Sequence, residues 1–398
     1  MIKKTFSASI VMLLAASCGL IVANLYYAQP LVALISKDLN MAPAAAGLLV
    51  TMSQAGYGLG LLFVVPTGDM FENRRLIIAI TALGIISLLS AAFSQNSAQF
   101  IAASFIIGIG SVAVQIIIPY AASIAPQEIQ GRVVGYVMSG LLLGVMLARP
   151  FASIVTEFSS WHYIFIISAA VLTLLMAVLF KMMPERRPQA SMGYGALLAS
   201  MGKMFVTMPV LRRRALYQAS LFCAFSLFWT VAPMYFMSDA YGMTQGHIAI
   251  FGLVGAAGVI AAPIAGRIAD KGVTQFKSAM AIITAGFGLL LPHFAGGQGM
   301  AEVLLLAACA VVLDFGAIAS QVMGQRVIFS LGAQYRSRVN GVYMGAFFAG
   351  GAAGSALGGY VYASYGFYAA MWTGFAMPVL AFLYLLTEPK ELYAKKDI

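Results

Sequence analysis

Apolar residues occur in long runs that are separated by short polar gaps along the whole chain. A helix that crosses a bilayer needs about 20 mostly apolar residues. The runs therefore predict an all-α membrane protein with twelve membrane-spanning helices. The expected spans are 7–35, 44–66, 76–94, 98–122, 133–156, 162–183, 215–237, 247–268, 278–294, 301–325, 339–361 and 367–387. The first run is longer than the bilayer is thick, so we expect this helix to tilt or to project beyond the membrane.

Composition excludes a soluble protein, because 61% of the residues are hydrophobic and only 9% are charged. A soluble domain carries about 25% charged residues. The net charge of +10 is spread over the polar gaps, so we expect no nucleic-acid partner. The three cysteines and three histidines are scattered, and no Ser–His–Asp or Cys–His grouping occurs. We therefore expect no metal site, no cofactor, no catalytic residues and no enzymatic activity.

Basic residues indicate how the chain is oriented in the membrane. All of the 23 lysines and arginines except Lys37 and Arg149 fall at the termini, in every second gap between spans, or, as Lys181 and Arg267 do, at a span end that borders such a gap. Short loops rich in Lys and Arg stay on the cytoplasmic side. The pattern predicts that both termini are cytoplasmic, and one missed or additional span would destroy the alternation.

The chain divides into two related halves. Residues 184–214 are the longest hydrophilic stretch, and we interpret them as a cytoplasmic linker with an interfacial amphipathic segment. Residues 1–183 and 215–398 would then each form a six-helix bundle. Landmarks recur between them: Asp270 follows Asp69 by 201 residues, and Arg338 follows Arg132 by 206. Parallel repeats of this kind place a substrate site near the midplane, between the halves.

Two loops carry a resemblance to a known family. The loop Pro66–Arg75 after the second span, and its counterpart Gly266–Lys271 after the eighth, resemble the cytoplasmic gating motif of the major facilitator superfamily. The resemblance implies the major facilitator fold. It also implies gating roles for the charged residues in and near these loops, which are Asp69, Arg74, Arg75, Arg132, Asp270, Lys271 and Arg338.

Three further segments resemble a subgroup of that family. Asn24–Pro30, Leu143–Arg149 and Ser337–Met344 are similar to signatures of bacterial efflux-type members close to the twelve-span drug:proton antiporters. This implies a multi-pass protein of the bacterial inner membrane that exports its substrate by using the proton gradient. Ser104 stands where these antiporters usually have an arginine, so the usual proton-relay arginine is missing.

Ionisable residues inside a bilayer are costly, so each is a functional hypothesis. Asp314 lies near the centre of the tenth span, and Arg149 lies in the fifth. Burial favours the neutral form of a carboxyl group, so Asp314 could load and release a proton; alternatively it is a structural carboxylate. Arg149 cannot lose its proton, so it could tune Asp314, bind an anion or pack helices. Whether the two side chains pair is open.

In the family that the chain resembles, spans 1, 4, 7 and 10 line the central cavity. Several amides and aromatic residues in these spans are therefore candidates for substrate binding. An aromatic wall suits flat, lipophilic or cationic molecules, although amides and aromatics also pack bilayer helices against each other. The candidates are Asn24, Tyr27, Gln115, Gln218, Phe222, Phe225, Trp229, Gln321 and Gln325.

The sequence supports three functional hypotheses. The first is a secondary active transporter that exports small amphipathic molecules or drugs by proton antiport and alternating access, as a monomer in the lipid bilayer. The second is proton-coupled uptake or exchange of a sugar or another polar metabolite. The third is a membrane sensor or assembly factor that transports nothing.

Overall fold

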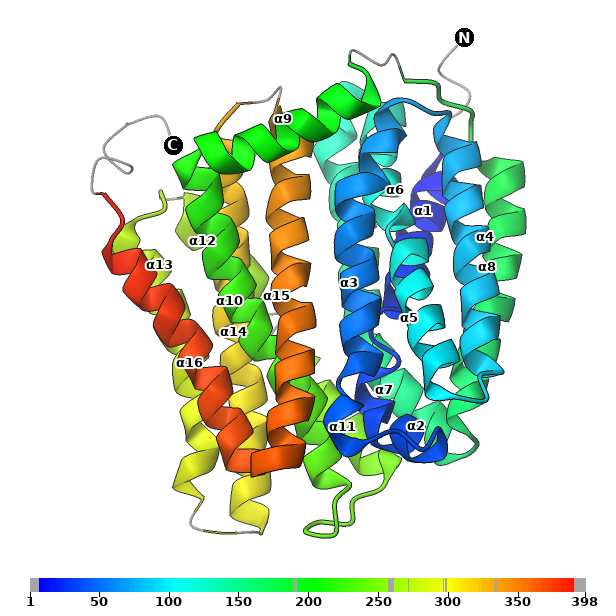
Figure 1. Ribbon diagram of the computed structural model, residues 1–398. Coiled ribbons are helices and arrows are strands. Elements are labelled where there is room, and N and C mark those ends of the chain that lie inside the picture. Colours follow the sequence, from blue (N-terminus) through cyan, green and yellow to red (C-terminus); the bar gives the residue numbers. More distant parts are fainter. Residues whose placement is uncertain are drawn as a thin grey trace.

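The structure is a computed structural model that describes residues 7–188, 192–256, 261–270, 272–295, 297, 299–332 and 335–389. The side chains of residues 256, 261, 262 and 270 also lie outside the description. The described residues form helices joined by turns, without a β-strand among them. Figure 1 shows the helices standing side by side in two groups, with α9 (Tyr194–Thr207) lying across one end of both.

The first half of the chain forms one group of helices. These helices are α1 (Ala8–Ala23), α2 (Val32–Asp38), α3 (Leu48–Phe63), α4 (Asn73–Ala92), α5 (Ser97–Ser111), α6 (Ala113–Ile124), α7 (Gln130–Glu157) and α8 (Trp161–Met182). Side chains cap several of them: Ser7 accepts a hydrogen bond from the backbone N–H of Ile10, and Asn96 accepts one from that of Gln99. Such caps satisfy donors that the first turn of a helix leaves free.

The second half forms the other group. Its helices are α10 (Pro209–Phe236), α11 (Gln245–Ala256), α12 (Ala261–Asp270), α13 (Gln275–Leu290), α14 (Met300–Phe329), α15 (Arg336–Tyr365) and α16 (Phe367–Leu386). α10 begins six residues before the expected start of the seventh span at residue 215. Pro209 occupies its first position, where a missing N–H costs nothing. Arg214 is buried and forms an ion pair with Glu388 beyond the end of α16, at 3.5 Å.

The structure confirms the all-α membrane architecture, because each expected span overlaps a helix or a pair of consecutive helices. Within the described residues, nine helices are long and apolar enough to cross a membrane. α15, which overlaps the expected span 339–361, is also long but is not among these nine. The first span differs from the expectation of one overlong helix. It is broken, because α1 ends at Ala23 and the chain becomes α-helical again only at Val32, after Pro30.

We call the end of the molecule that carries α9 the linker end, and the opposite end the distal end (Figure 1). The halves meet closely toward the distal end, where α3 packs against α15. A Cβ atom on Gly47 would lie 2.1 Å from the carbonyl oxygen of Ser355, and the Thr51 hydroxyl donates a hydrogen bond to the carbonyl oxygen of Ala352 at 3.1 Å. Such contacts close the distal end on this side.

On the other side, α7 and α11 complete the distal closure. The Glu157 carboxylate at the end of α7 accepts a hydrogen bond of 2.7 Å from the backbone N–H of Gly246 at the start of α11. A carboxylate is favourable there because the N-terminus of a helix is partially positive. Toward the linker end, in contrast, a Cβ atom on Gly131 or Gly135 of α7, or on Gly266 of α12, would have no atom within 4 Å. α3 and α15 stay in contact there, since a Cβ atom on Gly345 would lie 2.8 Å from Cδ2 of Leu62. The halves are therefore closed at the distal end, and toward the linker end α3 and α15 still join them.

Small residues allow α10 and α15 to pack at near backbone contact. We predict that Gly350→Ala lowers the thermal stability of the purified protein, because the added Cβ would lie 2.0 Å from the carbonyl oxygen of Ala219. Overpacking of this kind typically costs about 1–3 kcal/mol. Gly135→Ala is the control, because it also places alanine in a helix but meets no atom within 4 Å. Equal melting temperatures for the two variants in the same detergent would contradict the prediction.

Candidate functional site

A cavity of about 150 Å³ lies between the two halves. α1, α3, α6 and α7 line it from the first half, and α10, α11, α14 and α15 line it from the second. Its walls are mainly aromatic and aliphatic, with a few polar groups. The aromatic and polar lining residues are Tyr26, Tyr57, Gln115, Arg149, Gln218, Phe222, Phe225, Asp314, Gln321, Phe347 and Phe348. An apolar pocket with a few convergent polar groups is typical of a small-molecule site.

Arg149 brings a positive charge to this cavity from the middle of α7. Its side chain is only 7% exposed, and its Nε donates a hydrogen bond of 2.8 Å to Oε1 of Gln29. Its guanidinium carbon lies 4.3 Å from the ring centre of Trp229, and the rings of Tyr26 and Phe225 are within 5.3 Å. The Nη2 atom is buried and has no hydrogen-bond partner among the described residues. Aromatic faces thus supply much of the stabilisation of this charge.

Asp314 brings a carboxylate to the same cavity from α14. It is 5% exposed, and its Oδ1 accepts a hydrogen bond of 2.9 Å from Nε1 of Trp229. None of the ion pairs within 4.0 Å in the described part of the chain joins Asp314 to Arg149. Instead, Trp229 contacts both of them, with its ring against Arg149 and its N–H on Asp314. The structure therefore brings the two charges to one cavity and connects them through an indole.

The position of Trp229 depends on a glycine in α11. A Cβ atom on Gly255 would lie 2.2 Å from Cζ2 of Trp229. The indole therefore fills the space that any larger residue would occupy. Trp229 also contacts the rings of Phe225, Phe228 and Phe251. These contacts fix the ring, so that its N–H points at Asp314.

Five of the nine expected substrate-binding residues line the cavity: Gln115, Gln218, Phe222, Phe225 and Gln321. Nε2 of Gln115 donates a hydrogen bond of 3.0 Å to the hydroxyl of Tyr57. Nε2 of Gln218 donates to the carbonyl oxygen of Ala317 at 3.2 Å, and its Oε1 is buried with no partner among the described residues. The rings of Phe222 and Phe225 stack with their centres 5.1 Å apart. Amide groups and aromatic faces thus occur together on the cavity wall.

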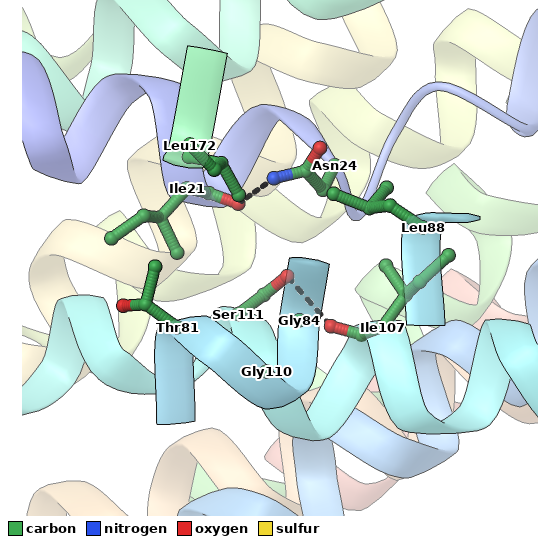
Figure 2. A pocket seen from close by; sticks show the side chains of 9 residues that line it. All are labelled: Ile21, Asn24, Thr81, Gly84, Leu88, Ile107, Gly110, Ser111 and Leu172. Carbon is green, nitrogen blue, oxygen red and sulfur yellow. Dashed lines mark hydrogen bonds between the residues drawn. The ribbon is translucent and has the colours of Figure 1, made fainter. Parts of the chain in front are cut away.

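Asn24 does not line this cavity, contrary to the expectation from its span. Figure 2 shows it among Ile21, Leu88, Ile107 and Leu172. These residues line a void of about 10 Å³ inside the first half. Its Nδ2 donates to the carbonyl oxygen of Ile21 at 3.0 Å, and its Oδ1 accepts a hydrogen bond from the hydroxyl of Ser168. Asn24 follows Ile21 by three residues and therefore lies on the same face, inside the first half, where its amide satisfies carbonyls of the last turn of α1.

Three other expected residues also lie outside the cavity lining. One of them is Trp229, although it contacts Asp314 and Arg149, which do line the cavity. Tyr27 is buried just after the end of α1, and Gln325 makes a contact of 3.9 Å with the sulfur of Met344. Conversely, the sequence did not single out Tyr26, Tyr57, Phe347 or Phe348, which do line the cavity. Tyr26 follows Val22, which also lines the cavity, by four residues, so the cavity face of α1 continues to Tyr26 and not to Tyr27. The other three come from α3 and α15, outside the spans that the resemblance assigned to the cavity.

The loop that carries the expected gating residues Arg74 and Arg75 is held by contacts within itself and with the start of the linker. The carboxylate of Glu72 accepts hydrogen bonds from the backbone N–H groups of Arg74, Arg75 and Arg186. Burial acts to raise the pKa of Glu72, but these hydrogen bonds outweigh it and lower the pKa. The side chain of Arg74 forms an ion pair of 2.6 Å with Glu185. The loop is thus tied to the segment that follows α8.

The remaining gating candidates lie at or near the linker end. Asp69, Arg75 and Arg132 are exposed. Arg338 donates a hydrogen bond of 3.1 Å to the hydroxyl of Ser200 in α9, which joins α15 to the linker helix. The side chain of Asp270 and the whole of Lys271 lie outside the described residues. Among the described contacts, neither Asp69 nor Arg74 reaches the second half.

Comparison of sequences relates the chain to membrane transporters. A family model described as Major Facilitator Superfamily matches residues 11–323. The uncharacterized transporter YgaY of Escherichia coli O157:H7 is 35% identical over 349 residues, which cover 88% of each chain. A probable transporter of Streptomyces coelicolor is 32% identical over 89% of this chain and 81% of its own length.

Comparison of structures gives the same fold at low sequence identity. A bacterial homologue of the human lysosomal transporter Spinster, in an inward-facing and unoccupied conformation, superposes with a TM-score of 0.78 at 12% identity, over 99% of both chains. The xylose transporter XylE of Escherichia coli, in an inward-open conformation, gives a TM-score of 0.71 at 15% identity, over 96% of both chains.

The contact between Trp229 and Asp314 yields a stability prediction. Trp229→Phe keeps an aromatic ring near Arg149 but removes the N–H that donates to Asp314. Loss of a hydrogen bond to a buried charged group typically costs about 1.5–3 kcal/mol. We therefore expect a lower melting temperature for this variant in purified form. Trp372→Phe is the control, because Trp372 is 52% exposed on α16, and a similar loss there would contradict the assignment.

Proposed function

Because the chain belongs to the major facilitator superfamily, whose members are secondary transporters that work by alternating access, we propose that it moves small amphipathic molecules through the central cavity with coupling to protons. The observation that carries this proposal is the position of Asp314. It is the carboxylate that lines the cavity, it is almost completely buried, and it is held by Trp229 beside Arg149. A carboxyl group in such a place can exchange a proton with whichever side of the membrane the cavity faces.

The amphipathic character of the substrate follows from the cavity wall. Phe222 stacks on Phe347 with ring centres 3.7 Å apart, and Tyr57 packs against Phe348 at 4.4 Å. Amides of Gln115, Gln218 and Gln321 interrupt this apolar surface. A molecule with a flat apolar body and one or two polar groups matches such a wall.

We propose that the linker end faces the cytoplasm of a bacterial cell and that the protein lies in the inner membrane with both termini cytoplasmic. The supporting observation is the density of basic residues at that end, including Arg74, Arg75, Arg132, Arg212 and Arg338. Residues 1–183 and 215–398 would act as two bundles joined by the linker 184–214. We propose a monomer as the working unit, driven by the proton gradient without a cofactor.

In this orientation the described conformation is closed toward the periplasm and corresponds to an inward-facing state. We propose that the charged residues at the linker end form contacts across the halves in the opposite, outward-facing state. Asp69 and Arg132 are exposed here and therefore free to do so. Asp270 and Lys271 are assigned the same role by their place in the repeat.

Two directions of transport are candidates. Export in exchange for protons, including export of drugs, is the direction that the efflux-type resemblance implies, and the aromatic wall fits lipophilic molecules. Uptake or exchange of a more polar metabolite or sugar together with protons is the second candidate. It is favoured by the buried Nη2 of Arg149 and Oε1 of Gln218, which lack hydrogen-bond partners among the described residues.

The coupling role of Asp314 can be tested in liposomes that contain a pH-sensitive dye. We expect wild-type protein to move protons when a transported compound is added, with ethidium, benzoate and xylose as the panel. Asp314→Asn should abolish this proton movement, because an amide cannot be protonated in its place. The control is Asp239→Asn, which removes an exposed carboxylate outside the helices. Proton movement that persists unchanged in Asp314→Asn would exclude Asp314 as the coupling site.

A further inference from the structure

Arg149 has a hydrogen-bonding capacity that its surroundings do not use. A guanidinium group carries five N–H donors in a planar fork. The described hydrogen bond is the one from Nε to Gln29, and Nη2 is buried with no partner in the described part of the chain. Leaving such a donor unpaired in a buried site costs free energy, more for a charged group than for a neutral one. An acceptor that arrives with the substrate would remove this cost.

We propose that the central cavity recognises an organic anion, with a carboxylate at Arg149 and a flat apolar body among Phe222, Phe225 and Phe347. This inference rests on the proposed function, because it assumes that the cavity is the path of the substrate. The fork of an arginine fits the two oxygens of a carboxylate. The three phenylalanine rings lie next to Arg149 or stack on one another, so one small molecule can reach both parts of the site.

A cationic substrate fits this site less well. Arg149 keeps its positive charge at any physiological pH, and it lines the cavity together with Asp314. A cation that approached Asp314 would therefore be repelled by Arg149 in a medium that screens charges poorly. The aromatic rings that attract cations are also already occupied in part, because Tyr26, Phe225 and Trp229 face the guanidinium.

The same geometry determines how the anion and the proton are linked. A bound carboxylate and an ionised Asp314 would repel each other across the cavity, so binding of the anion favours protonated Asp314. The charged group that faces Asp314 is Arg149 on α7. Trp229 on α10 donates a hydrogen bond to Asp314, and Cys309 precedes Asp314 on α14. α11, α12, α13, α15 and the turn Leu291–Phe294 also pack against α14. Their charged or ionisable described side chains lie near helix ends or toward the linker end: His247, Arg267, Lys277, His293, Arg336, Arg338, Tyr343, Tyr360, Tyr362 and Tyr365.

The consequence is that substrate and proton bind together rather than in competition. They would then cross the membrane in the same direction, with no net charge on the pair. This favours uptake or exchange together with protons over export in exchange for protons. The substrate would be a monovalent organic acid rather than a sugar or another polar metabolite.

The experiment measures binding to the full-length protein in lipid nanodiscs, with three probes of similar shape and different charge: benzoate, benzamide and benzylamine. We expect benzoate to bind more tightly than the other two, and Arg149→Gln to weaken it roughly tenfold to hundredfold. Benzamide binding should change little in the same variant. Arg149→Lys keeps the charge but not the fork, so its affinity for benzoate should lie between those of wild type and Arg149→Gln.

The proton linkage provides a second readout. Benzoate affinity of the wild type should rise as the pH falls from about 8 to about 6, where benzoate itself stays ionised, and binding should take up protons from a weakly buffered solution. Asp314→Asn imitates the protonated acid, so it should bind benzoate at least as tightly as wild type and without this pH dependence. If Arg149→Gln does not fold, Asp314→Asn and Arg149→Lys still test the proposal.

Several results would overturn the inference. It is wrong if benzoate does not bind, if benzylamine or benzamide binds as tightly as benzoate, or if benzoate releases protons on binding. It is also wrong if Arg149→Gln binds benzoate normally. Failure of the proposed function looks different: benzoate would bind as expected, but liposomes with the protein would move neither solute nor protons. Transport of ethidium without binding of benzoate would refute the anion site alone.

Discussion

A charge inside a bilayer must be stabilised by the protein itself, and this constraint governs the centre of the molecule. Arg149 and Asp314 satisfy it without touching each other. Trp229 contributes its ring to one and its N–H to the other, and Gln29 adds a hydrogen bond to Arg149. The two residues therefore stay available to a ligand, whereas a direct ion pair would consume both. Gly255 belongs to the same arrangement, because only a residue without a side chain leaves room for the indole.

Close packing of the halves makes the cavity possible. Near the distal end, Nε2 of Gln54 in the first half donates to the hydroxyl of Ser226 at 2.7 Å, and that hydroxyl lies 2.6 Å from the hydroxyl of Ser355. Small polar and glycine residues of this kind hold bilayer helices at short distance, where apolar burial alone provides no driving force. The halves thus meet through hydrogen bonds that can be exchanged for others when the molecule changes state. The aromatic cavity lies where these contacts end.

Much of the fold could be predicted from the sequence, because the bilayer itself requires long apolar runs and basic residues in every second gap. Neither pattern depends on how the helices pack against each other. The membrane helices could be predicted in this way, and Arg149 and Asp314 stood out as charges inside spans. That both reach one cavity could not be predicted, because it depends on how the two halves pack. The break after Ala23 could not be predicted, since the run of apolar residues continues through it. The face of this span that meets the cavity could not be predicted either: Asn24 lies with Ile21 inside the first half, and Tyr26 lies with Val22 at the cavity. Trp229 was named as a wall residue, but its contact with both charges depends on Gly255, which is distant in sequence.

The internal repeat explains why the charges occur in one copy each. At the repeat offset of 206 residues, Asp314 corresponds to Gly108 and Arg149 corresponds to Ser355. A Cβ atom on Gly108 would lie 2.1 Å from the carbonyl oxygen of Ser53, so no side chain fits there. Ser355 is completely buried among hydroxyl groups of α10. Both equivalent positions are therefore committed to helix packing. The repeat gives two similar bundles, and the site lies where corresponding positions of the two bundles carry different residues.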